Sequence, residues 1–166
     1  MMNIKELQNK QKELDEFIVS KMNLNLTDEH MLVDMMLAAI DELCNEVKED
    51  IENAEEWIDE LHFVLSIGNR LGVKMQETNM LGSGWNLQQL YKANENHLLS
   101  AMRLSKCFKH WSKKRPSATD MALITNHLGI CVESIKLACI KLNTDMEQEY
   151  NKKYEINRER QLRGDY

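Results

Sequence analysis

The sequence has 166 residues, of which 43% are apolar, and a formal net charge of −6. This length and composition predict one globular domain, residues 1–166, with a hydrophobic core. The pI of about 5.4 argues against general nucleic-acid binding, which favours basic surfaces. No apolar run approaches the roughly 20 residues that span a bilayer. The N-terminal segment is charged from its start, so we expect neither a membrane partner nor a signal peptide.

Helical periodicity runs along nearly the whole chain, whereas no segment alternates apolar and polar residues over the length of a strand. The expected helix boundaries follow from Asp28 at one start, Gly72 at one end and the single proline, Pro116, in a break. The pattern predicts helices over residues 4–22, 28–51, 54–71, 87–109, 121–142 and 145–162. The fold class is therefore all-α, a bundle of five to six helices.

Residues 87–98 resemble residues 147–161, and each segment follows a long apolar helix by a similar interval. A duplication of a helix pair, about 28–98 and 99–166, would explain this similarity. Chance likeness between helix ends rich in Asn and Glu is the alternative, and the sequence leaves both open.

The four cysteines show no CxxC spacing, and three of them fall in apolar helical patterns. They are Cys44, Cys107, Cys131 and Cys139. This usage indicates buried thiols in a reducing compartment, so we expect a cytoplasmic protein.

The segment "EEWIDELHFVLS", residues 55–66, is apolar on almost every side of a helix, yet carries Glu56 and Asp59 on one stripe. Unpaired charge beside a core is costly and would normally be neutralised or lost. A solvated acidic face is the simpler interpretation, and we prefer it for the neighbouring acidic residues. For Glu56 and Asp59 we favour a bound cation.

The preceding helix carries Glu42 and Glu46 four residues apart, at the edge of its apolar stripe. Side chains at i and i+4 converge, and two like charges there repel unless a cation lies between them. Four carboxylates from two adjacent helices of a bundle are a suitable site for Mg²⁺, which prefers oxygen ligands. We therefore predict Glu42, Glu46, Glu56 and Asp59 as metal ligands.

Glu56-x-x-Asp59 followed by His62-Phe63 resembles the second acidic motif of the all-α NTP pyrophosphohydrolases. This is the MazG-type superfamily, which includes the all-α dimeric dUTPases. Three more segments resemble the family's basic Trp segment, its C-terminal motif and its N-terminal Gln-x-x-Leu-Asp helix. They are "CFKHWSKK" (107–114), "YNKKYEINRERQLRGDY" (150–166) and "LQNKQKELD" (7–15).

The resemblance implies hydrolysis of a nucleoside triphosphate to the monophosphate and pyrophosphate, with Mg²⁺ held by acidic helices. It implies that Lys153, Asn157 and Arg160 hold phosphates and that Gln11 lies near the base. Four further residues match family motifs with less defined roles: Tyr150, Gln161, Lys109 and Trp111.

The sequence departs from the family in several places. The first acidic motif of the family is Glu-x-x-Glu, whereas Glu42 has Asn45 at +3 and Ala39 at −3. Glu46 is the best available substitute, so the register of this motif stays ambiguous. Either Glu42 or Glu46 would position or deprotonate the attacking water. In addition, the basic Trp segment follows both acidic motifs, Tyr154 replaces an Asn, and Asp165 precedes the final Tyr.

The expected function is a Mg²⁺-dependent pyrophosphatase acting on dUTP, in a homodimer with an extensive interface. A MazG-like enzyme for another dNTP is one alternative, and an inactive helical interaction protein is another. We interpret His62 as a structural hydrogen-bonding residue, because hard Mg²⁺ does not favour imidazole. His97, His110 and His127 form no metal-spaced cluster with cysteine, so zinc is not expected.

Overall fold

The computed structural model describes residues 3–22, 28–105 and 116–164. Within these ranges the regular elements are all helical, which confirms the all-α prediction. They are α1 (Ile4–Met22), α2 (Asp28–Asp41), the π-helix η1 (Glu42–Val47), α3 (Ala54–Leu71), α4 (Leu87–Ser105), α6 (Ala118–Lys141) and α7 (Met146–Arg163).

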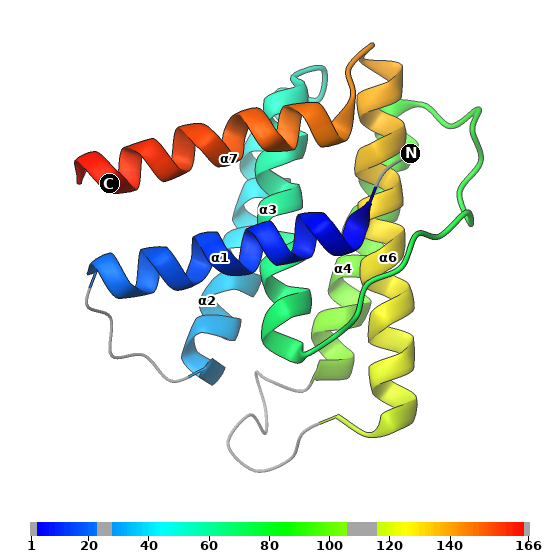
Figure 1. Ribbon diagram of the computed structural model, residues 1–166. Helices are drawn as coiled ribbons and strands as arrows, with labels where there is room; N and C mark the ends of the chain where they lie inside the picture. The colour runs from blue at the N-terminus through cyan, green and yellow to red at the C-terminus, as the bar shows by residue number, and fades with distance from the viewer. Residues whose placement is uncertain (1–2, 23–27, 106–115, 165–166) are drawn as a thin grey trace.

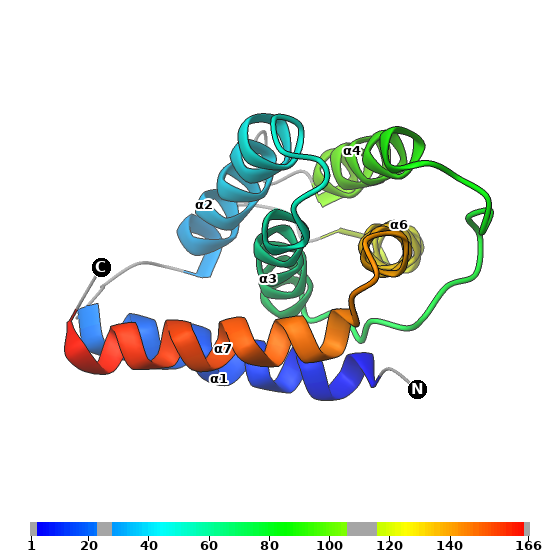
Figure 2. The same cartoon turned by 90° about the horizontal axis from the view of Figure 1, so that it is seen from above.

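Helix α3 is the centre of the fold. Helices α1 and α7 lie side by side in one layer, which crosses the helices of a second layer (Figure 1). Seen from above, α3 lies between α2, α6 and the α1–α7 layer (Figure 2). It contacts all of these helices and η1, while α4 packs mainly on α6. Trp57, Leu61 and Leu65 of α3 have no exposed surface. This helix therefore contributes to the core and also carries Glu56 and Asp59.

The ends of α3 follow from its capping residues. The side chain of Asn53 accepts a hydrogen bond from the backbone N–H of Glu55, as an N-cap residue does. Gly72 ends the helix with φ of 72°, a left-handed conformation that suits glycine. The predicted range 54–71 is confirmed.

The prediction of one continuous helix over residues 28–51 is wrong. The α-helix ends at Asp41 and continues as the π-helix Glu42–Val47, in which the N–H of Lys48 donates to the carbonyl of Leu43. The wider turn keeps both Leu43 and Val47 fully buried. π-Helical turns are rare and often lie at functional sites.

The remaining boundaries differ little from the prediction. α6 begins at Ala118 instead of residue 121, because Ser117 caps it by accepting from the N–H of Asp120. α4 is described to Ser105, and the rest of its predicted range lies outside the described residues. By length and composition alone, α6 is a candidate to cross a membrane. However, 61% of its apolar window is buried inside the protein, as in a core helix.

The N-terminal helix is attached to both neighbours through buried polar contacts. Lys10 donates to the side chain of Asn151 on α7 at 2.7 Å. Gln8 donates to the Val73 carbonyl at 3.0 Å and accepts from the Met75 N–H at 2.9 Å. Gln8 thus binds the segment that follows α3 and fixes the position of α1 along α3.

Replacing Gln8 with alanine should destabilise the protein. The variant leaves the Met75 N–H and the Val73 carbonyl without their partner, and we expect a loss of about 2–4 kcal/mol in the free energy of unfolding. Urea denaturation measures this loss. Asn9→Ala, which removes an exposed amide on the same helix, is the matched control and should change stability little. Equal stability of the two variants would show that Gln8 does not hold the fold.

Candidate functional site

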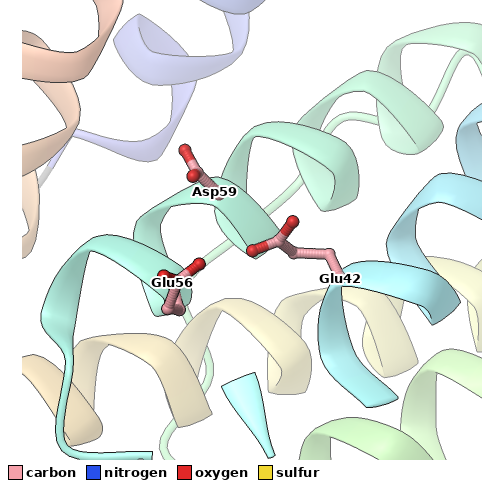
Figure 3. Close-up of side chains that lie close together, drawn as sticks. All are labelled: Glu42, Glu56 and Asp59. Atoms are coloured by element: carbon pink, nitrogen blue, oxygen red, sulfur yellow. The ribbon is translucent and has the colours of Figure 1, made fainter. Parts of the chain in front are cut away.

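Three carboxylates converge between η1 and α3. Glu42, Glu56 and Asp59 each place an oxygen within 4.8 Å of the others (Figure 3). Glu42 begins the π-helix, and the other two lie one turn apart on α3. The structure thus brings together three of the four predicted metal ligands.

The start of α3 suits an acidic pair. Glu56 is the third residue of the helix, and its Oε1 accepts a hydrogen bond of 3.4 Å from the Asn53 amide. The unsatisfied N–H groups at a helix N-terminus favour negative charge. Asp59 is three residues later, so both carboxylates face η1 from the same side of α3.

Glu42 is the most perturbed carboxyl group of the three. Burial, followed by the charges of Asp59, Glu56 and Glu46, raises its pKa to about 8. Its Oε1 is buried and has no hydrogen-bond partner. A hard divalent cation takes such oxygen ligands and would relieve the repulsion, so the residues present fit Mg²⁺.

The other positions of the first acidic motif do not join this cluster. Glu46 is exposed and lies outside the group of three, although its charge contributes to the raised pKa of Glu42. The Asn45 amide donates to Asp41 and so is directed along its own helix. Ala39 is fully buried and brings no ligand. Among the described residues, Glu42 alone represents this motif in the cluster.

Helix α7 brings positive charge to the opposite wall. The Nζ of Lys153 lies 3.0 Å and 3.1 Å from the two carboxylate oxygens of Asp59. Burial raises the pKa of Asp59, and this contact with Lys153 opposes the rise. Asn157 and Arg160 follow at spacings of four and three on the same helix.

A cleft of about 320 Å³ joins the two walls. Its charged and strongly polar lining consists of Glu42, Asp59, Lys153, Asn157 and Arg160. The remaining lining comes mostly from α1 and α3 and is apolar or uncharged apart from Asp15: Gln11, Leu14, Asp15, Ile18, Met35, His62, Phe63 and Ser66. Along α3, Asp59 and Ser66 are separated by roughly 10 Å of helical rise. The cleft therefore changes from mainly charged to a mixture of polar and apolar side chains along one helix.

The uncharged part of the cleft contains a hydrogen-bonded group around Gln11. The Gln11 amide donates to Asp15 at 2.8 Å, and its carbonyl accepts from the Tyr150 hydroxyl at 2.8 Å. The Ser66 hydroxyl donates to Asp15 at 2.7 Å. Burial raises the pKa of Asp15 despite these bonds. Gln11 is only 3% exposed and is therefore held in a single orientation.

Asp15 and Ser66 were not predicted as site residues. Their spacing in the sequence nevertheless indicates a place near the site. Asp15 is four residues after Gln11, and Ser66 is seven residues after Asp59, so each shares a helix face with a predicted site residue. Periodicity does not show that these two faces meet, which is why the sequence did not identify the pair.

Several predicted residues lie elsewhere. Lys109 and Trp111 fall outside the described residues. Gln161 does not line the cleft, although its Oε1 is buried without a partner. Tyr154, at a departure from the family motif, is buried and stacks on Tyr150 with ring centroids 6.5 Å apart. Its role in this structure is packing of α7.

A family model described as dUTPase matches residues 3–165, which is nearly the whole chain and includes every helix of the structure. No curated protein matches the chain. No solved structure matches it either.

Proposed function

Because the chain belongs to the all-α dUTPase family, we propose that it hydrolyses dUTP to dUMP and pyrophosphate in a Mg²⁺-dependent reaction. The supporting observation is the cleft, in which two members of the carboxylate cluster, Glu42 and Asp59, face the cationic groups of α7. Such a site suits a polyphosphate with its cation, because each wall offsets one of the two charges.

Glu42, Glu56 and Asp59 would hold the cation. When bound, Mg²⁺ would offset the charge of the triphosphate and make water a better nucleophile at neutral pH. The carboxylates themselves keep the cation at one end of the cleft, next to the N-terminus of α3.

Glu42 is the favoured general base of the two carboxylates that the sequence left as alternatives. Its Oε1 has no hydrogen-bond partner and can therefore accept a proton from an attacking water. Burial and its acidic neighbours raise its pKa to about 8 in the absence of a cation, and a cation bound beside it would favour the ionised form that accepts the proton. Glu46 is exposed and stands apart from the cluster.

Lys153, Asn157 and Arg160 would bind the phosphates. Lys153 pairs with Asp59 in the ligand-free protein, so a bound phosphate would take over the Lys153 contact while the cation takes over Asp59. The planar guanidinium of Arg160 can bind two phosphate oxygens at once. Gln11 would lie at the nucleoside and the fully buried Tyr150 would hold Gln11 through its hydroxyl, while contributions from Lys109 and Trp111 stay predictions.

The pyrophosphatase proposal is tested by measuring pyrophosphate release from each dNTP, with Mg²⁺ and with a chelator. We expect Mg²⁺-dependent release from dUTP, and a loss of about 100-fold or more in Glu56→Gln because a ligand of the cation is removed. Glu55→Gln, an exposed neighbour, is the matched control and should keep the activity.

Other outcomes separate the alternatives. Release from a different dNTP would keep the mechanism and change the substrate. Release that does not depend on Glu56 would contradict the assigned site. No release from any dNTP would favour the inactive interaction protein.

We also propose a cytoplasmic homodimer. The described cysteines are free thiols, as expected in a reducing compartment, and fractionation of cells with a specific antibody would check the location. Large apolar side chains remain exposed on several helices: Leu37 is 55% exposed, Ile140 57% and Leu162 61%. Exposed apolar surface of this kind often marks a contact with another chain.

Sedimentation equilibrium tests the homodimer. We expect twice the mass of the 19.5 kDa chain. Leu37→Asp or Ile140→Asp should shift the equilibrium toward the monomer, according to which of these exposed side chains lies in the dimer contact. Asn9→Asp, at an exposed position on α1, is the control for added charge. A wild-type protein that sediments as a monomer at all concentrations would contradict the homodimer.

A further inference from the structure

His62 combines two features that packing alone does not explain. Its side chain lines the cleft and is 7% exposed. Its Nδ1 lies 2.6 Å from the Oε1 of Gln11. Its Nε2 is buried and has no hydrogen-bond partner. One nitrogen of the ring is therefore strongly bound, and the other is left without a partner.

The bonds of Gln11 determine which nitrogen of His62 carries the proton. The Gln11 amide nitrogen donates to Asp15, so its carbonyl oxygen is the atom that faces Tyr150 and His62. A carbonyl oxygen only accepts, and His62 must therefore donate through Nδ1–H. Burial and the charge of Lys153 lower the pKa of His62 to about 3, so the ring is neutral. Its Nε2 is then purely an acceptor.

A purely structural role explains the contacts of the His62 ring and of its Nδ1, but not the unpartnered Nε2. The ring stacks on Tyr150 with centroids 4.4 Å apart, and Nδ1 completes the bonding of Gln11. Neither contact supplies a donor to Nε2. Buried polar atoms in folded proteins nearly always have a partner, and a buried acceptor without one is a reason to look for a ligand. Here the atom belongs to a residue of the cleft wall.

The position of His62 along α3 indicates which part of a substrate it meets. It follows Asp59 by three residues, roughly 4.5 Å of helical rise. Asp59 and its partner Lys153 lie toward the preceding turn of α3. Phe63 and Ser66 lie toward the following turn, where Ser66 contacts Asp15 of α1. A triphosphate bound at the carboxylates would thus place its nucleoside beside His62.

We propose that His62 Nε2 accepts a hydrogen bond from the nucleoside half of the substrate and so selects nucleotides that carry a donor at that point. This inference rests on the proposed function. The donor is either the imide N–H of the base or a hydroxyl of the sugar, which share the chemistry that a neutral imidazole acceptor recognises. Asp15, acting through Gln11, is a positioning residue for this acceptor.

Two substitutions separate the two ring nitrogens. His62→Asn keeps an amide N–H near the position of Nδ1 and removes the acceptor near Nε2. His62→Gln places its carbonyl oxygen near Nε2 and so offers the acceptor again. We expect His62→Asn to raise the KM for dUTP about tenfold with a small change in kcat, as for one lost hydrogen bond. His62→Gln should recover a large part of the loss.

Substrate analogues identify the donor. If the imide N–H is the donor, N3-methyl-dUTP should bind the wild type about tenfold more weakly than dUTP, while His62→Asn does not distinguish the two. If the sugar hydroxyl is the donor, 2′,3′-dideoxyuridine triphosphate should show this pattern instead. In either case, the ¹⁵N resonance of His62 Nε2 should be that of an unprotonated nitrogen and should move when dUMP is added without metal.

Failure of the His62 proposal and failure of the pyrophosphatase proposal would give different results. A wild type that binds dUMP and releases pyrophosphate, while folded His62→Asn has an unchanged KM, would overturn this inference and leave the proposed function intact. An Nε2 that carries the proton in the free protein would also overturn it. A wild type that neither binds dUMP nor hydrolyses any dNTP would overturn both.

Discussion

The structure depends on keeping three carboxylates together beside a hydrophobic core. Glu56 and Asp59 project from the central helix, and Glu42 meets them from η1. Like charges this close must be compensated, by a proton on Glu42, by the contact between Lys153 and Asp59, or by a cation. In the ligand-free protein Lys153 meets Asp59, and the raised pKa of Glu42 favours its protonated form. Under the proposed function a cation and a phosphate would replace this proton and this ammonium group.

The α1–α7 layer makes this exchange possible. Both helices cross α3, and they are joined by polar contacts such as that between Tyr150 and Gln11. α7 brings Lys153 to the carboxylates, and α1 brings Gln11 to His62. One packing interaction therefore positions the proposed phosphate-binding and nucleoside-binding parts of the cleft relative to the acidic cluster. Changes that loosen this layer should affect both parts together.

The sequence was sufficient for most of the helices and for three of the four predicted metal ligands to be found together. Caps and periodicity located α3, and Glu56 with Asp59 followed from their spacing beside an apolar face. The π-helix was not predictable, because its i→i+5 bonds leave no distinct mark on a 3.6-residue pattern. For the same reason Glu42 and Glu46 stayed equivalent until the structure separated them. Asp15 ends the matched Gln-x-x-Leu-Asp segment but was given no role, since its partner Ser66 belongs to another helix. The helix-pair duplication stays a prediction.

Titration calorimetry of Mg²⁺ binding is the most direct test of the carboxylate cluster. Measured near pH 7 in two buffers that differ in ionisation enthalpy, it reports both the binding and the protons released. The protein should bind Mg²⁺ with release of a substantial fraction of a proton, because Glu42 has a pKa of about 8 without metal. Glu42→Gln should abolish the release, and Glu46→Gln should retain it. No Mg²⁺ binding by the wild type, or the same proton release from wild type and Glu42→Gln, would contradict the account.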